Sequence, residues 1–206
     1  MQRPAFRFRY RAKDEAPLES GKVFLRAPRI DDFAEWSSLR ARSRAFLEPW
    51  EPRWPDDDLT REAYRYRVRR YDADRSGGLA LPLFVFVKDS GRLVGGLTIG
   101  GIRRGAAEAC TLGYWMGEPF AGKGYMHDAL SAIIPHVFDR MRLHRIEAAC
   151  IPENERSARL LEKVGFRREG HLRGYLKING TWRDHLLYAL ISEDWKTARN
   201  ETKATG

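Results

Sequence analysis

The stretch GYWMGEPFAGKGYMHDALSAIIPHVF (113–138) constrains the fold of this chain more than any other. A strand-like run leads directly into two glycines, and apolar residues at helical spacing follow them. Gly122 and Gly124 have no Cβ, so positive φ angles cost them little and a ligand can approach the main chain closely. We therefore expect a strand, a glycine turn and a helix that runs to about residue 140, kinked at Pro135 because proline removes one backbone hydrogen bond.

The start of such a helix suits a phosphate group. Its first N–H groups have no partner within the helix, and the helix dipole places partial positive charge there. A tight strand-to-helix turn without any ligand explains the same glycines. A P-loop is excluded, since no Gly-Lys-Ser/Thr follows at the required spacing, and a dinucleotide fingerprint would need a third glycine.

Composition narrows the class of protein. The chain has 206 residues, 43% of them hydrophobic, which suits one domain with a real core. The formal net charge of +9 favours anionic partners, such as nucleic acid, ribosomes, membranes or polyanionic cofactors. Cys110 and Cys150 lack metal-type spacing, so we expect no metal and a reducing compartment, the cytoplasm. No apolar run approaches the roughly 18 residues of a membrane span, so a membrane is not expected as a partner.

The chain divides into three predicted segments. Residues 1–20 are rich in arginine and are interpreted as a basic N-terminal arm, with a mitochondrial-type leader as the alternative. Residues 21–195 form one folded domain. Residues 196–206 are expected to be a disordered C-terminal tail.

Hydrophobic periodicity and turn residues predict intermixed strands and helices. A charged helix at 59–74 is expected to carry Leu59, Ala63, Tyr66 and Arg70 along one side, and three prolines predict a loop at 44–58. The order indicates an α+β fold with a mixed central β-sheet of about seven strands flanked by about four helices. Strands are expected at 22–27, 81–102 (a hairpin turning at 89–91), 107–116, 144–151 and 166–191 (a hairpin turning at 179–180), with helices beginning near 31, 59, 122 and 153.

These motifs together resemble the GNAT acetyltransferase superfamily, over Lys22 to about Trp195. In that family a Gln/Arg-x-x-Gly-x-Gly/Ala motif wraps the pyrophosphate of acetyl-CoA. Gly122-Lys123-Gly124 supplies its glycines here, although its leading position is Pro119. The family's Asn-x-x-Ser segment falls on Asn154 and Ser157, in PENERSARLLEKVGFRREG.

Within the superfamily, the segments GYWM, FAGKGYM, HRIEA, PENERS and GHLRGYLKINGTWRDH most resemble ribosomal-protein-alanine N-acetyltransferases, a label that also covers enzymes with other amine substrates. The resemblance implies a GNAT-like single domain that uses acetyl-CoA as co-substrate. It implies transfer to a primary amine, first of all the N-terminal α-amino group of a ribosomal protein, by direct attack in a ternary complex. The alternatives are a small amine (antibiotic, polyamine or amino acid) as acceptor, and a catalytically weak ribosome- or RNA-binding module. Ribosome association is expected, and the protein is expected to be a monomer or a homodimer.

The residues expected to hold acetyl-CoA come from three places. The amides of 121–126 would meet the phosphates and Lys123 would add a point charge. The strand edge at 115–117 would pair with the pantetheine arm, as the resemblance implies. Asn154 would bond a pantetheine amide, unless it simply caps its helix. The predicted set is Trp115, Met116, Gly117, Ala121, Gly122, Lys123, Gly124, Tyr125, Met126, Asn154 and Ser157.

The predicted catalytic groups are Ser157 and Glu147. Ser157 would give a proton, directly or through water, to the departing thiolate. The position of the family's tyrosine acid is Leu161 here, so that acid is missing, which argues against strong general-acid catalysis. Glu147 is favoured as the base because RIEAAC alternates like a strand, with Glu108 and Glu169 as further candidates. Its alternative role is that of a cross-strand partner for arginine.

The predicted wall of the acceptor site is the proline-stiffened segment FLEPWEPRWP. Family resemblance places Trp50 and Trp54 of this segment over the acceptor cleft, and Tyr175 could reach the same place. Both tryptophans could instead cap the core.

Overall fold

The computed structural model describes residues 16–204, with side chains for residues 16–201. Most of the predicted basic arm (1–15) therefore lies outside the described residues. The strands are β1 (Leu18–Ser20), β2 (Val23–Arg26), β3 (Leu81–Val87), β4 (Leu93–Arg103), β5 (Ala109–Met116), β6 (Arg145–Cys150), β7 (Arg167–Ile178) and β8 (Thr181–Ile191). The α-helices are α1 (Phe33–Arg42), α2 (Arg44–Leu47), α3 (Arg61–Ser76), α4 (Tyr125–Pro135), α5 (Glu155–Lys163) and α6 (Ser192–Ala204), joined by the short helices Ile30–Asp32, Glu48–Trp50, Glu118–Phe120 and His136–Arg140.

One mixed sheet organises the domain, in the strand order β1-β2-β3-β4-β5-β6-β8-β7. The predicted α+β class with a mixed central sheet is confirmed, and both predicted hairpins, β3–β4 and β7–β8, are present. The sheet has eight strands because residues 18–20, placed in the N-terminal arm by the sequence prediction, pair with β2. Within the described residues, no helix is long and apolar enough to cross a membrane.

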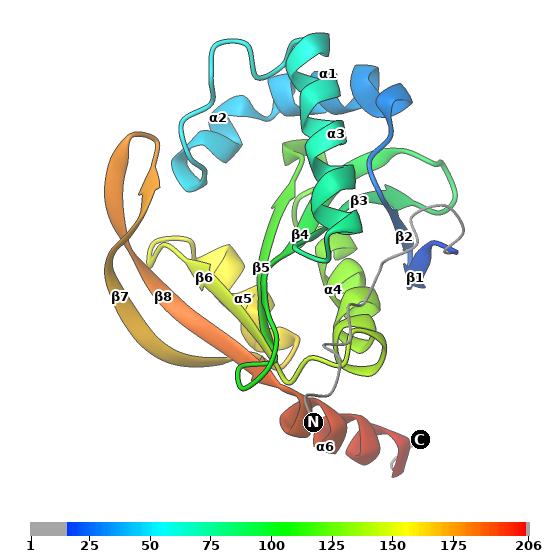
Figure 1. Ribbon diagram of the computed structural model, residues 1–206, viewed down its shortest axis with the longest axis vertical. Coiled ribbons are helices and arrows are strands. Elements are labelled where there is room, and N and C mark those ends of the chain that lie inside the picture. The colour runs from blue at the N-terminus through cyan, green and yellow to red at the C-terminus, as the bar shows by residue number, and fades with distance from the viewer. Residues whose placement is uncertain (1–15, 205–206) are drawn as a thin grey trace, which may run out of the picture.

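Both faces of the sheet are covered, as alternation along β3 demonstrates. Leu81, Leu83 and Val85 pack in the larger core cluster with α4 and α5, whereas Phe84 and Phe86 pack with α1 and α3. The helices therefore form layers on opposite sides of the sheet (Figure 1). Burying each such side chain stabilises the fold by about 1.5–3 kcal/mol, so both layers hold the strands in register.

The centre of the sheet is split. β5 and β6 run parallel but pair only over Ala109–Thr111 and Arg145–Glu147. Beyond these residues β5 continues to Met116 and β6 to Cys150 with no pairing between them. The gap lies where α4 begins, and it positions the site described below.

Two local predictions were wrong, each because tertiary packing decided the conformation. Segment 44–58 begins with α2 and a 3₁₀ turn, and Pro49 sits in the first turn, where a missing N–H costs nothing. The predicted helix at 59–74 is present as α3; its buried residues are Tyr64 and Val68, whereas Tyr66, on the side named from the sequence, is 69% exposed. Residues 196–204, expected to be disordered, belong to α6, whose Trp195 stacks against Phe138 at 5.4 Å.

The helix that follows the glycine turn reaches Arg140, as expected. Its α-helical part ends at Pro135, and His136–Arg140 continue as a π-helical turn. The proline therefore changes the hydrogen-bond pattern of the helix instead of ending it.

Candidate active site

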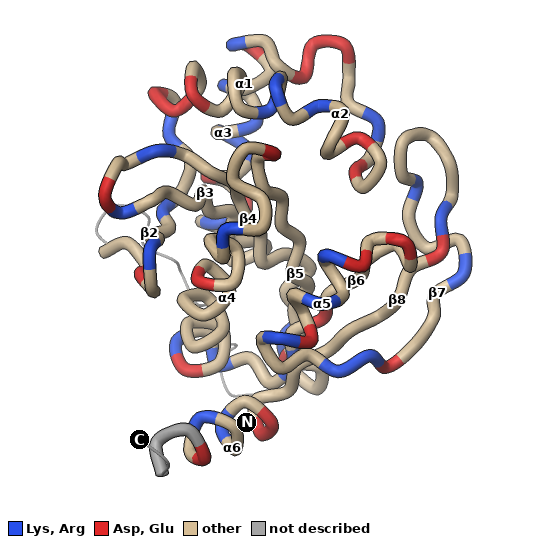
Figure 2. Tube along the Cα trace, turned by 180° about the vertical axis from the view of Figure 1, so that it is seen from behind, with Lys and Arg blue, Asp and Glu red and all other residues tan. Residues whose placement is uncertain are grey.

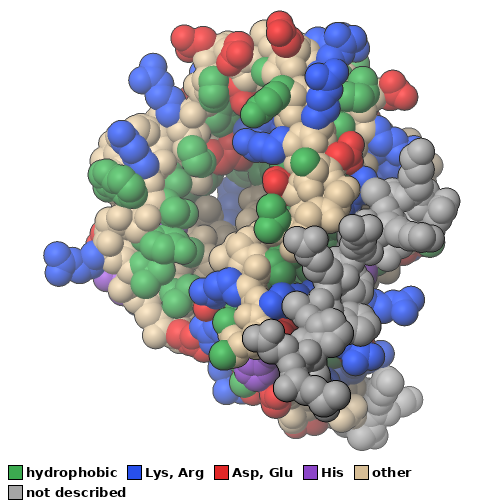
Figure 3. Space-filling view, viewed as in Figure 1, with side chains coloured by type: hydrophobic (Ala, Val, Ile, Leu, Met, Phe, Trp, Pro, Cys, Tyr) green, Lys and Arg blue, Asp and Glu red, His purple; other side chains and the backbone are tan. Residues whose placement is uncertain are grey.

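A cavity of about 1120 Å³ fills the split between β5 and β6. Its walls come from both split strands, the start of α4, α5, the segment 45–52 and the β7–β8 hairpin. Figure 3 shows a hollow on this face, with hydrophobic side chains gathered beside it. A space of this size and lining can enclose a large ligand together with a second, smaller group.

The glycine turn opens onto the cavity. Gly122 (φ 75°) and Gly124 (φ 84°) both adopt left-handed conformations, and both line the cavity. A Cβ added at either position would meet no atom within 4 Å, so the space in front of the main chain is open. The first amides of α4 point out of the helix without intrahelical partners, which fits a pyrophosphate group. Ala121 lines the cavity, but its amide already donates to the Glu118 carbonyl at 3.1 Å.

The neighbouring predicted residues divide into two groups. Trp115, Met116, Tyr125 and Met126 line the cavity. Lys123 and Gly117 do not line it: the Lys123 Nζ lies 5.8 Å from the ring centroid of Phe120, and Gly117 packs against α1. A Cβ at Gly117 would lie 2.4 Å from Leu39 Cδ1, so packing, not ligand approach, explains that glycine.

Asn154 and Ser157 meet at the start of α5. The Asn154 Oδ1 accepts a hydrogen bond from the Ser157 amide at 3.2 Å, so Asn154 does cap the helix. Both residues also line the cavity. The Asn154 side-chain amide group keeps its two N–H donors for another partner, so capping and ligand binding are compatible.

The sequence did not reveal that Tyr114 contacts Ser157. The two hydroxyl oxygens lie 2.7 Å apart, and Tyr114 comes from β5, 43 residues earlier. Burial raises the pKa of Tyr114 well above its usual range, so the phenol stays protonated. Cys150 lines the cavity as well. Burial raises the pKa of its thiol, and a hydrogen bond with Ser157 acts in the opposite direction and lowers it. The cavity wall thus carries neutral proton donors.

Leu161, at the position of the family's tyrosine acid, is 1% exposed and forms part of this wall. It contributes only apolar surface. The phenol on this wall comes from the strand side, through Tyr114.

The structure does not bring Glu147 into the cavity. Its carboxylate pairs with Arg103 at 2.6 Å and with Arg145 at 2.9 Å, which is the alternative role considered for it. Glu108 pairs with Arg104, and Glu169 pairs with Arg145, which lowers the Glu169 pKa. The three glutamates considered as bases therefore lie outside the cavity wall, held by arginines.

The opposite end of the cavity is bounded by the segment 45–52. Trp50 lines the cavity. Trp54 is buried instead (5% exposed), and its Nε1 donates to Glu51 Oε2 at 2.7 Å. Arg40 holds the same carboxylate with two hydrogen bonds of 2.7 and 2.8 Å and stacks over Trp54 at 4.0 Å. Trp54 thus supports Glu51, which does line the cavity.

The β7–β8 hairpin closes the same end. The Asn179 amide donates to the Glu51 carbonyl at 2.9 Å, which ties the hairpin to the segment 45–52. Tyr175 does not line the cavity but packs edge-on against His185, with ring centroids 5.6 Å apart. His185 lines the cavity and was not singled out from the sequence.

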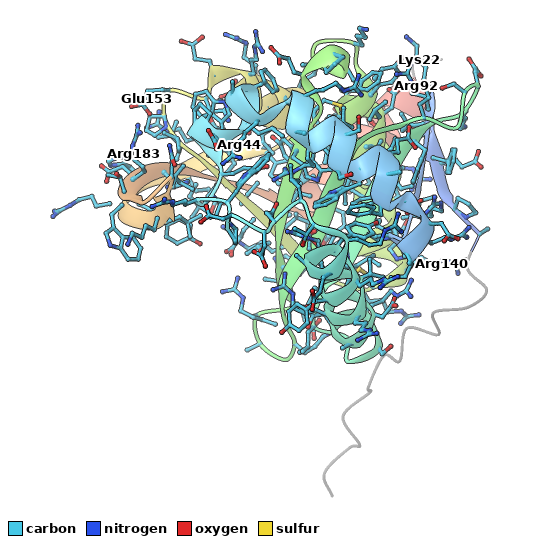
Figure 4. The ribbon with its side chains drawn as sticks, turned by 90° about the horizontal axis from the view of Figure 1, so that it is seen from above. Lys22, Arg44, Arg92, Arg140, Glu153 and Arg183 are labelled. Atoms are coloured by element: carbon cyan, nitrogen blue, oxygen red, sulfur yellow. The ribbon has the colours of Figure 1, made fainter. Side chains whose placement is uncertain are left out.

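Acidic side chains at the cavity are all ion-paired. Among the residues that the structure describes, Glu51 pairs with Arg40, Glu153 with Arg183 and Glu155 with Arg159. Figure 4 places Glu153 and Arg183 together at the hairpin end of the molecule. No group of three or more His, Cys, Asp and Glu in the described part is placed to hold a metal ion.

Lys and Arg residues occur in many parts of the described chain and alternate with Asp and Glu along it (Figure 2). On α5, Arg156, Arg159 and Lys163 line the cavity beside the helix start that carries Asn154. These charges and the amides of α4 favour an anionic ligand along the α4–α5 side. The cavity thus combines an anion-binding end, a wall of neutral hydroxyls and a partly apolar second end.

Comparison with protein families agrees with this geometry. Residues 22–167 match the family described as "Acetyltransferase (GNAT) domain". The [Ribosomal protein uS5]-alanine N-acetyltransferase of Escherichia coli (strain K12) is 33% identical over 193 residues, covering 93% of this chain and 100% of that protein.

Two solved structures are similar over most of their length. Mycobacterium smegmatis RimJ in complex with CoA-disulfide has a TM-score of 0.81 and 38% identity, covering 87% of each chain. The ribosomal-protein-S5-alanine acetyltransferase from Vibrio fischeri has a TM-score of 0.81 and 32% identity, covering 88% of this chain and 99% of that one.

Proposed function

The chain belongs to the GNAT acetyltransferase family, and we propose that this acetyl-CoA-dependent N-acetyltransferase modifies the N-terminal α-amino group of a protein within a ternary complex. The observation that carries the proposal is the cavity itself. Its glycine-turn end suits acetyl-CoA, and its other end is walled by a separate segment and hairpin. Both substrates can therefore be present at once, as direct attack requires.

Bound acetyl-CoA supplies a thioester whose carbonyl carbon the amine attacks. For that ligand, the amides after Gly122 and the cations of α5 are placed to hold phosphates, and Asn154 to hold the pantetheine arm. Ser157 would pass a proton to the departing thiolate and take one from Tyr114, and solvent would return a proton to Tyr114, whose protonated form burial favours. Proximity supplies a large part of the rate in this arrangement.

The acceptor assignment rests on the absence of an unpaired carboxylate at the described cavity wall. A protein α-amino group has a pKa near 7.7–8.0, whereas a lysine side chain has a pKa near 10.4. At pH 7 roughly a tenth of an N-terminus is neutral, against well under a thousandth of a lysine. A site whose glutamates are all held by arginines favours the amine that needs less help with deprotonation.

The names of two relatives indicate which kind of protein is the acceptor. The Escherichia coli relative is named for the alanine of ribosomal protein uS5, and the Vibrio fischeri structure is named for the alanine of S5. We extend this to a ribosomal protein with a small first residue as the acceptor here, met in the cytoplasm. The net charge of +9 would attract the enzyme to rRNA around such an N-terminus. A binding module without catalysis finds no support in relatives that are named as acetyltransferases.

The test compares two peptides of the same sequence. One has a free N-terminal alanine and an internal lysine that is blocked, and the other has a blocked N-terminus and a free lysine. With acetyl-CoA, mass spectrometry should show fast acetylation of the first peptide and slow acetylation of the second. Preferential reaction of the lysine, or reaction of small amines alone, would overturn the proposed acceptor while leaving the enzyme class intact.

A further inference from the structure

His185 combines deep burial with a place on the cavity wall. It lies on β8, is 2% exposed and lines the cavity together with Trp50 and Glu51. Nothing in the scheme above uses it. A nearly buried imidazole on the cavity wall is a candidate proton acceptor, because histidine is the side chain best suited to accept a proton near neutral pH.

The hydrogen bonding of the ring fixes its tautomer. His185 Nδ1 lies 3.0 Å from the carbonyl oxygen of Arg183, and a carbonyl oxygen can only accept. Nδ1 must therefore carry the proton in the neutral ring, which leaves a lone pair on Nε2. The edge-on ring of Tyr175 packs against the imidazole and holds its orientation.

Charged groups of the cavity lining and of the β7–β8 hairpin have partners of their own. Glu51, from the segment after α2, is neutralised by Arg40. Glu153, after β6, is neutralised by Arg183 of β8 itself. On β7, Lys177 lines the cavity; farther along the hairpin, Asp184 accepts from the Gly174 amide and pairs with His171. The described lining holds two imidazoles: His127 at the start of α4, whose Nδ1 lies 3.5 Å from Asp128, and His185 on β8, which is the buried one.

From this geometry we infer that His185 Nε2 is the proton acceptor for the attacking amine, an inference that rests on the proposed transfer to an amine in this cavity. The amine nitrogen forms a bond to the acetyl carbonyl carbon, and the carbon–sulfur bond breaks. One proton passes from the amine nitrogen to Nε2, and the CoA thiolate takes one proton from the Ser157 hydroxyl or solvent. His185 then returns its proton to solvent, and a proton from solvent restores the Ser157 hydroxyl through Tyr114, so atoms and charge balance over a turnover.

Two substitutions isolate this role. His185→Asn keeps a side-chain N–H near the Nδ1 position for the Arg183 carbonyl but removes Nε2. His185→Gln places an uncharged amide near Nε2 that cannot act as a base. With a peptide carrying a free N-terminal alanine, both variants should lose about 10²-fold in kcat, with little change in peptide KM. The matched control is His171→Gln, which removes a half-exposed histidine of the same hairpin and should retain kcat.

Folding and binding are measured beside the kinetics. Acetyl-CoA affinity, measured by calorimetry, should match wild type in both His185 variants. The dependence of kcat on pH should be retained in His171→Gln and should become flatter in the two His185 variants. An unchanged kcat, or a change confined to KM, overturns the inference. If the wild-type enzyme prefers another amine, the acceptor proposal fails, yet His185→Gln must still lower kcat for that amine.

A third readout needs neither a variant nor turnover. The ¹⁵N NMR spectrum of the wild-type protein should show Nε2 as the unprotonated nitrogen of neutral His185. Adding the alanine peptide without acetyl-CoA should shift that signal. A neutral ring protonated on Nε2 overturns the inference, even if both His185 variants fail to fold.

Discussion

The hydroxyl oxygen of Tyr114 lies 2.7 Å from that of Ser157, although β5 and α5 are separated by a parallel strand and a long helix in the chain. Either oxygen can be the donor, so the pair can pass a proton along its length. Because burial keeps the phenol protonated, the pair remains a donor across the whole pH range in which the amine reacts.

Ser157→Ala removes the inner member of this pair. We expect kcat to fall by up to about 10²-fold while acetyl-CoA affinity stays close to wild type. Steady-state kinetics and calorimetry separate the two quantities. Ser131→Ala, which deletes a serine of α4 that bonds only the His127 carbonyl, is the control. A loss confined to KM would make Ser157 a binding residue.

Tyr114→Phe removes the outer member. We expect a smaller fall in kcat than for Ser157→Ala, and a loss of about 1 kcal/mol in the free energy of unfolding from the missing hydrogen bond. The double variant should be little worse in kcat than Ser157→Ala alone, because the phenol acts through the serine. Additive effects of the two substitutions on kcat would show that they act independently.

Gly124→Val places a side chain where the phosphates would lie. Acetyl-CoA affinity should fall at least about tenfold, equivalent to about 1.4 kcal/mol. The left-handed φ also strains any side chain, by about 1–3 kcal/mol. Gly105→Val controls for this strain, since Gly105 has φ 76° and no atom within 4 Å of an added Cβ, but lies outside the cavity. Similar stability loss in both variants with unchanged affinity in Gly124→Val would argue against this phosphate site.

Glu147→Gln tests the base suggested by strand alternation. Since Arg103 and Arg145 hold this carboxylate outside the cavity, we expect kcat to remain at the wild-type level. The free energy of unfolding should change by no more than about 1 kcal/mol, as for partly exposed ion pairs. A kcat loss comparable with that of His185→Gln would restore Glu147 as the base.

Alkaline conditions should weaken the fold through Cys110. Burial, aided by the Glu147 charge, raises the pKa of this thiol from 9.0 to about 12. Below pH 9 the folded and unfolded chains both carry the proton, so this thiol does not reduce the free energy of unfolding. Between pH 9 and about 12 the unfolded chain releases the proton and the folded chain keeps it, so the free energy of unfolding falls by up to about 1.4 kcal/mol per pH unit. Urea unfolding should show a shallower fall in Cys110→Ala than in wild type, and equal slopes would contradict the burial effect.

Local sequence signals predicted the elements whose cause is local. The Asn179-Gly180 hairpin, the glycine turn before α4 and the alternating strands follow from turn chemistry and periodicity. Local signals say less about which side of α3 is buried, because that depends on the Thr60 cap and on the ring contact between Tyr64 and Trp36. The order of α6 depends on a contact between Trp195 and Phe138 that periodicity does not encode.

The same distinction runs through the site. The glycines and the Asn154–Ser157 segment were visible as motifs, since their spacing along one helix start is local. Tyr114 and His185 were not visible as motifs. The role of each depends on a partner from another element or on the cavity that the split creates. Glu147 was placed near the cavity because alternation predicts the face of a strand on which a side chain lies. Alternation does not predict that Arg103 and Arg145 pair with this carboxylate.

The split between β5 and β6 affects the tendency of the protein to aggregate through exposed strand edges. Strand edges with free main-chain groups normally sit at the margin of a sheet, where a strand from another molecule can add and start aggregation. Here the open edges lie inside the sheet order, between β4 and β8, behind the segment 45–52 and the β7–β8 hairpin. A second chain cannot lie along them as it would along an outer strand. The fold thereby leaves hydrogen-bonding edges inside the cavity without offering them as a template for its own polymerisation.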